Sequence, residues 1–168
     1  MVVNGQALLK AAPIKNMLPE KIREHGVSHG LGEVGYDIRL KQNVNFYPGK
    51  HSHVDVITNT GRQGFEIFDG CFALASAIEE FQMPTNLVGI VHDKSTWARR
   101  GLSVFNTVIE PGWFGHLTLE LVYHGSNELH LPAGCGIAQV IFHQLAVPAH
   151  YEGKYQNQED RPVEAKHG

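Results

Sequence analysis

The sequence lacks features that would assign it to several classes of protein. No apolar run approaches the ~18 residues of a membrane span, and the N-terminal stretch has no apolar core of a secretory signal. Only two cysteines are present, Cys71 and Cys135, and we interpret both as buried thiols of a reducing compartment. The net charge is −3, which gives no argument for nucleic-acid binding. We therefore expect a cytoplasmic protein with no membrane or nucleic-acid partner.

Glycine and proline are plentiful, with 18 Gly and 8 Pro among 168 residues. They separate short runs that are rich in β-branched and aromatic residues, a pattern typical of an all-β sandwich or barrel. The absence of a repeat or linker predicts one domain over residues 1–168. We predict strands at Tyr36–Leu40, Val44–Tyr47, Val54–Ile57, Phe65–Phe68, Cys71–Ala77, Leu87–His92, Ser103–Ile109, His116–Leu121, Glu128–Leu131 and Cys135–His143.

Three short helices are predicted between these strands. The first spans Gly5–Ala12 and takes Asn4 as its N-cap. The second spans Leu18–His25, and the third spans Thr96–Arg100. Four glycines make 26–35 a predicted loop.

The stretch from Asp93 to Glu120 is the most informative about function. Lys94, Ser95 and Thr96 place a cation and two hydroxyls where the third helix begins, and helix N-termini bind phosphates. The hairpin that follows carries two carboxylates, Glu110 and Glu120, and Glu120 lies on the polar face of its strand. A phosphate cradle that leads into two carboxylates has the layout of a nucleotide site.

Three motifs, KSTWARRGL, IEPGWFGHLTLEL and KYQNQ, resemble those of the dCTP deaminase branch of the trimeric dUTPase superfamily. Weaker agreement runs from Gly35 to about Gln158. The resemblance implies a mainly β fold, a distorted β-barrel or jelly-roll (dUTPase-like, β-clip) with a few short helices. It also implies a homotrimer with active sites between subunits. The implied activity is deamination of dCTP to dUTP and ammonia, in the biosynthesis of dUTP and dTTP.

The resemblance also assigns residue roles. Glu120 matches the catalytic glutamate, and Arg99 matches the arginine beside the reacting base. Deamination needs a water activated for attack at C4 and then a proton for the leaving ammonia, and one carboxylate can supply both. The implied substrate-binding residues are Lys94, Ser95 and Thr96 at the triphosphate, Thr107, Val108 and Glu110 in the hairpin, and Tyr151, Lys154 and Gln158 in the tail.

Plainer interpretations stand beside these roles. Residues 94–96 could form a solvated, capped helix, and Glu120 could be an ordinary solvated glutamate. Residues 148–168 are polar and could be a frayed end, whereas the resemblance implies a tail that closes over the nucleotide.

The residues that could bind a metal do not match the motif of a zinc site. Zinc-dependent base deaminases need His-x-Glu followed by Pro-Cys-x-x-Cys, and neither element occurs in spite of 11 histidines. We therefore expect no protein-bound zinc and no other protein metal site. Mg²⁺ is expected as the companion of a bound triphosphate, since it needs few protein ligands there.

One spacing departs from the deaminase pattern. Eight residues separate Leu102 from Pro111, whereas typical dCTP deaminases have ten and dUTPases have eight. Glu110 then falls where dUTPases carry the aspartate that activates water against the α-phosphate. The alternatives are therefore a dUTP diphosphatase, a bifunctional enzyme that makes dUMP, or a non-catalytic nucleotide-binding regulator. The family also uses this loop to read the base and to bind dTTP as a feedback inhibitor.

Overall fold

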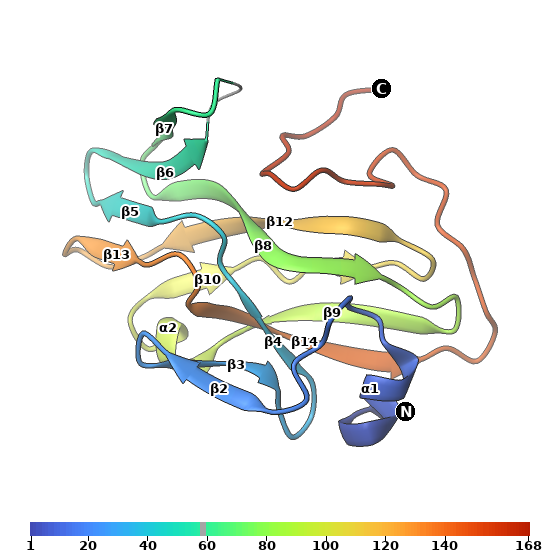
Figure 1. Ribbon diagram of the computed structural model, residues 1–168. Helices are drawn as coiled ribbons and strands as arrows, with labels where there is room; N and C mark the ends of the chain where they lie inside the picture. Colours follow the sequence, from blue (N-terminus) through green and yellow to red (C-terminus); the bar gives the residue numbers. More distant parts are fainter. Residues whose placement is uncertain (58–59) are drawn as a thin grey trace.

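Strands dominate the computed structural model, which describes residues 1–57 and 60–168 (Figure 1). Among these residues the largest sheet has seven strands, in the order β11-β9-β14-β4-β3-β2, with β1 paired to β14. Its strands are β1 (Val2–Val3), β2 (Lys21–Glu24), β3 (Val27–Leu31), β4 (Tyr36–Arg39), β9 (Leu87–Asp93), β11 (Val108–Ile109) and β14 (Gly136–Gln144).

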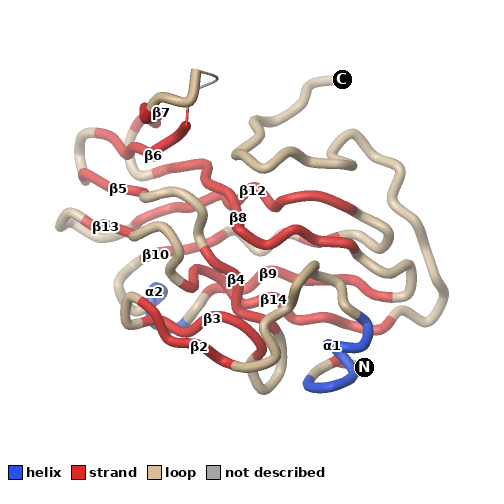
Figure 2. The backbone as a smooth tube through the Cα atoms, viewed as in Figure 1, coloured by secondary structure: helices blue, strands red, loops and turns tan. Residues whose placement is uncertain are grey.

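Two smaller sheets complete the architecture (Figure 2). The three-stranded sheet β10-β12-β8 packs against the largest sheet through contacts of β8 with β4 and of β10 with β9. The four-stranded sheet β13-β5-β6-β7 extends from it through contacts of β6 and β7 with β8. The strands are β5 (Val44–Tyr47), β6 (His51–Ile57), β7 (Gln63–Asp69), β8 (Phe72–Gln82), β10 (Leu102–Val104), β12 (Phe114–Tyr123) and β13 (Leu129–Leu131).

The core lies between these sheets and follows the alternation of side chains along each strand. Leu117, Leu119 and Leu121 of β12 are buried, as are Val140 and Phe142 of β14. Because successive side chains of a strand point to opposite faces, burying one face leaves the other available for polar groups. The predicted mainly β, distorted jelly-roll fold is confirmed, although the described strands form separate sheets rather than a closed barrel.

The helices are short. The first predicted helix is confirmed as α1 (Gly5–Ala11), and Asn4 is its N-cap residue, but the Asn4 side chain makes no capping hydrogen bond and donates to Glu33 O instead, at 2.9 Å. The third is α2 (Ser95–Ala98), which begins one residue earlier and ends two residues earlier than predicted. Neither helix is long and apolar enough to cross a membrane in the part of the chain that the structure describes.

The predicted helix at 18–25 is wrong, and the predicted loop at 26–35 holds only for residues 32–35, between β3 and β4. Residues 21–31 form a β-hairpin, in which β2 pairs antiparallel with β3. Its two-residue turn is His25-Gly26, with φ of 51° and 75°, the left-handed pair that favours tight hairpins. Gly30 allows close strand packing, because a Cβ there would lie 2.3 Å from Glu20 O. Gly26 and Gly30 therefore mark a turn and a close approach within the hairpin, whereas Gly32 and Gly35 lie in the loop that follows β3.

The predicted single strand at Ser103–Ile109 is also wrong, because the segment crosses between sheets. β10 pairs with β12, whereas β11 pairs with β9 in the largest sheet. The side chain of Asp93 helps to fix the crossing, since its Oδ1 accepts a hydrogen bond from Val104 N at 2.7 Å. β-branched residues favour strand conformation, but they do not reveal which sheet each half joins.

The two cysteines differ in burial. Cys135 is buried, as predicted, and desolvation raises the pKa of its thiol to about 12, which keeps it protonated and unreactive. Cys71 is only half-buried, so the prediction of two buried thiols holds for one of them.

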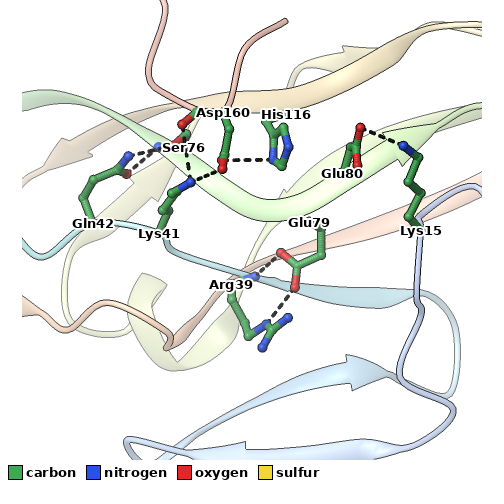
Figure 3. A network of polar contacts seen from close by, with 9 residues as sticks. All are labelled: Lys15, Arg39, Lys41, Gln42, Ser76, Glu79, Glu80, His116 and Asp160. Carbon is green, nitrogen blue, oxygen red and sulfur yellow. Dashed lines mark hydrogen bonds and ion pairs between the residues drawn. The ribbon is translucent and has the colours of Figure 1, made fainter. Parts of the chain in front are cut away.

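An ion pair between β4 and β8 ties two sheets together (Figure 3). The Glu79 carboxylate is 3% exposed and accepts hydrogen bonds from Arg39 Nε and Arg39 N, each at 2.8 Å. The neighbouring pair of Lys15 with Glu80 is 38% and 32% exposed. Removing one partner of a buried pair leaves the other uncompensated, whereas solvent screens an exposed pair.

We therefore expect Glu79→Ala to lower the free energy of unfolding by roughly 3 kcal/mol. Glu80→Ala is the matched control and should cost at most about 1 kcal/mol. Urea denaturation measures both, and equal costs for the two variants would contradict this role of Glu79.

Candidate functional site

Glu120 projects from the face of β12 opposite the core leucines. It is half-buried, and its Oε2 atom is buried with no hydrogen-bond partner among the described residues. Desolvation raises the pKa of this carboxyl above its ordinary value. A carboxyl with a raised pKa exchanges protons more readily near neutral pH, as general acid–base chemistry requires.

The C-terminal tail lies along β12 of the same chain. Gln158 forms a parallel bridge with Gly115, and Gln158 O accepts a hydrogen bond from His116 N at 3.1 Å. Thr118 Oγ1 accepts two more from the tail, from Gln158 Nε2 at 2.9 Å and from Val163 N at 3.0 Å. Thr118 lies on the same face as Glu120, two residues before it, so the tail reaches the strand that carries the carboxyl.

A cavity of about 340 Å³ separates part of this tail from the sheet. It is lined by Leu74 of β8, Glu66 of β7 and tail residues 161–166. Leu74 is the register partner of Glu120 across β8 and β12. The space therefore borders the strand pair that holds Glu120, and its lining carries two cations, Arg161 and Lys166, beside two carboxylates, Glu66 and Glu164.

The turn before β12 is joined to the start of the tail. Tyr151 N donates to Pro111 O at 2.8 Å, and Trp113 Nε1 donates to Tyr155 O at 2.7 Å. Glu110 opens this turn with an exposed side chain, and its carbonyl accepts a hydrogen bond from Trp113 N at 3.1 Å. Half-buried Tyr151 packs against the core.

Three other assigned residues lie in the tail and at β11. Lys154 is exposed, and its Nζ donates to Lys166 O within the tail. Val108 is 54% exposed on β11. Thr107 precedes it, and its carbonyl accepts a hydrogen bond from Val91 N of β9.

Lys94 turns into the body of the protein. Its Nζ lies 2.5 Å from Asp37 Oδ2 and 3.2 Å from Ser28 Oγ, and the side chain is only 10% exposed. Asp37 is buried on β4, and its Oδ1 has no partner among the described residues. We had assigned no role to Asp37 or Ser28. The available signal is an acidic residue between Tyr36 and Ile38 in a short strand, but its partner Lys94 lies 57 residues away in the chain.

The other assigned residues in and beside α2 face solvent. Ser95, Thr96 and Arg99 are all exposed. Figure 1 shows α2 on one side of the molecule and the tail on the other. One chain thus brings the Gln158 side chain to Thr118, two residues before Glu120, and joins the 110–113 turn to the tail, whereas α2 lies on the other side of the molecule from the tail.

No group of three or more His, Cys, Asp and Glu side chains is arranged to hold a metal ion within residues 1–57 and 60–168.

Comparisons with known proteins identify relatives of the chain. A family model described as dCTP deaminase-like matches residues 3–145. A dCTP deaminase of Acidobacterium capsulatum is 31% identical over 95% of this chain and 96% of its own length. One from Campylobacter jejuni is 40% identical over 70% of this chain and 68% of its own.

Solved structures share the fold at low identity. A dCTP deaminase from Agrobacterium tumefaciens superposes with a TM-score of 0.57 at 16% identity, over 86% of this chain and 48% of that one. A phage phi11 dUTPase, in which a structural Mg(II) ion is coordinated, gives 0.52 at 14% identity over 83% and 92%. At such identities these likenesses concern the fold alone.

Proposed function

The chain belongs to the dCTP deaminase-like family, and we propose that it hydrolyses dCTP to dUTP and ammonia. The observation that best supports this proposal is Glu120, a half-buried carboxyl with a raised pKa on the strand that the tail contacts. Relatives named dCTP deaminase at 31% and 40% identity support the choice of substrate. The proposal places the activity in the cytoplasm, in the synthesis of dUTP and dTTP precursors.

Glu120 would move two protons in this reaction. As a carboxylate it takes a proton from the water whose oxygen bonds to C4 of cytosine and passes that proton to N3, which gives a tetrahedral intermediate with a hydroxyl and an amino group on C4. It then takes the hydroxyl proton and delivers it to the amino group, so that the C4–N bond breaks, ammonia leaves and the C4 carbonyl forms. Arg99 is proposed to lie beside the base and to stabilise the charge that develops there.

We propose that a complete site needs two copies of the chain. The position of α2 on the other side of the molecule from the C-terminal tail supports a homotrimer in which α2 of one subunit faces β12 and the tail of another (Figure 1). Ser95 and Thr96 would then bind the triphosphate with Lys94, while Thr107, Val108 and Glu110 contact the nucleoside. Tyr151, Lys154 and Gln158 would complete the site as the tail closes.

Mg²⁺ is proposed to enter with the triphosphate and to neutralise phosphate charge when bound. The donor set fits an ion that is held mostly by phosphate and water, since Mg²⁺ keeps several waters and needs few carboxylates. The Asp37 carboxylate, whose Oδ2 contacts Lys94, lies beside one of the proposed phosphate ligands, and its Oδ1 has no partner among the described residues. No zinc is included in the proposal.

The proposal is tested by incubating the protein with dCTP and Mg²⁺ and resolving dCTP, dUTP and dUMP by chromatography. We expect mainly dUTP, with dUMP as a slow minor product. Release of diphosphate would need Glu110 to orient water against the α-phosphorus. Its side chain is exposed and one methylene longer than aspartate, and a displacement of ~1 Å can cost ~10²-fold in rate.

The other outcomes separate the alternatives. Formation of dUMP as fast as ammonia, with no dUTP accumulating, would favour a bifunctional enzyme in which Glu110 is a working base. Hydrolysis of dUTP alone would indicate a diphosphatase. Tight dCTP binding without turnover would indicate a regulatory protein. Adding dTTP to the same assay tests feedback inhibition.

A further inference from the structure

The side-chain amide of Gln156 binds the tail to the turn before β12. Its Oε1 accepts hydrogen bonds from Phe114 N at 2.7 Å and from Asn157 N at 3.3 Å. Its Nε2 donates to Gly112 O at 2.9 Å and to Tyr151 O at 3.1 Å. Both amide hydrogens and both acceptor positions are therefore used, and three of the four partners are backbone groups outside residues 155–157.

The chain beyond Gln156 is placed by this anchor. Asn157 adopts a left-handed φ of 58°, which turns the backbone toward β12. Gln158 then lies so close to Gly115 that a Cβ on the glycine would approach Gln158 N to 2.5 Å. From there the Gln158 amide donates to Thr118, on the Glu120 side of the strand. The position of Gln158 thus follows from the register that Gln156 sets two residues earlier.

Another contact of the tail is weaker than that of Gln156 because its side chains are more exposed to solvent. Asp160 pairs with Lys41 and lies 3.3 Å from His116 Nδ1 (Figure 3). Its side chain is 50% exposed and that of Lys41 is 35% exposed, so solvent screens the pair. Gln156 is half-buried, and its four hydrogen bonds converge on one amide. Gln156, together with Trp113 Nε1, which donates to the carbonyl of neighbouring Tyr155, therefore holds this part of the tail more firmly than Asp160 does.

We propose that Gln156 is a positioning residue, which fixes the tail on the 111–114 turn so that Lys154 and Gln158 reach the nucleotide. The identity of that nucleotide rests on the proposed function. The anchoring of the tail by Gln156 does not depend on it. Gln156 does not touch the reacting atoms in this role. It acts through the residues on either side of it.

The test compares three substitutions with a control in the full-length protein. Gln156→Ala removes all four hydrogen bonds. Gln156→Glu keeps an oxygen for Phe114 N but turns a carboxylate toward two carbonyls. Gln156→Asn keeps the amide on a side chain shorter by one methylene and should restore part of the function. Glu152→Ala is the matched control, an exposed change in the same segment.

Two measurements are made on each variant. Trypsin cleavage after Lys154, followed by mass spectrometry without nucleotide, reports release of the tail. We expect it to be about 10-fold faster or more in Gln156→Ala and Gln156→Glu, because several hydrogen bonds are lost together. Steady-state deamination of dCTP should show kcat/KM lower by roughly 10- to 100-fold, with kcat affected as well as KM.

Each outcome decides the proposal. Unchanged trypsin cleavage in Gln156→Ala would show that the amide does not hold the tail. Faster cleavage with wild-type kcat and KM would show an anchor with no positioning role, and it would also overturn the proposal. If the wild type released no ammonia, the proposed function would fail separately. The cleavage assay and the affinity for dCTP would then test Gln156 by the same criteria.

Discussion

Replacing Glu120 with glutamine should nearly abolish ammonia release while leaving the affinity for dCTP within a few-fold. Glutamine keeps the shape and a hydrogen-bonding oxygen, but it cannot take a proton from water or return one to ammonia. Loss of such a group costs about 10²–10⁴ in rate. Ammonia release under saturating dCTP, together with a binding isotherm, measures both quantities. Activity above about a tenth of wild type would remove Glu120 from the mechanism.

The same variant should be more stable than the wild type at neutral pH. Desolvation raises the pKa of Glu120 in the folded protein, so its charged form weakens folding once the pH exceeds the pKa of the unfolded chain. That cost is absent below the ordinary value of 4.5, where the carboxyl is protonated in both states, and complete above the folded pKa. Thermal unfolding at several pH values should show an advantage of Glu120→Gln that disappears as the pH falls. A less stable variant at pH 7 would contradict the origin assigned to the shift.

The strands that sequence reasoning located best carry a local signal. Val44–Tyr47 was predicted with both ends correct, because β-branched and aromatic residues there are bounded by turn residues. The prediction missed the β2–β3 hairpin because the glycines in it serve two structural purposes that the sequence pattern does not separate. Gly26 makes a turn with positive φ, whereas Gly30 is crowded by the backbone of Glu20. Only the pairing of the strands distinguishes these purposes.

Sequence reasoning named candidate residues of the site, but it did not predict how they are arranged. Resemblance selected Glu120 and Gln158, but burial of the glutamate depends on packing that no local pattern contains. The contact of Lys94 with Asp37 likewise joins strands that are distant in sequence. Gln156 was recognised only as a letter of the KYQNQ motif, since a polar side chain in a polar tail carries no signal of its own.

Removing the tail after Pro148 should leave a folded protein with severely impaired turnover. The removed residues are mostly exposed and polar, so little core is lost. They include Lys154 and Gln158, which we assign to phosphate and base, and the segment whose Val163 N contacts Thr118 beside Glu120. A closed tail also keeps out water other than the attacking molecule. We expect kcat/KM to fall by ~10²-fold or more.

A point substitution that displaces the tail without removing it tests whether the position of the tail matters for turnover. Gly115 has φ of 137°, and a Cβ there would lie 2.5 Å from Gln158 N and 2.7 Å from Gln158 O. Gly115→Ala should therefore push the complete tail away from β12 and reproduce much of the kinetic loss. Circular dichroism and sedimentation of both variants show whether the fold and assembly survive. If folded, truncated protein retained wild-type kcat/KM, residues 149–168 would have no part in catalysis, and the loss in Gly115→Ala would have to come from strain in β12 itself.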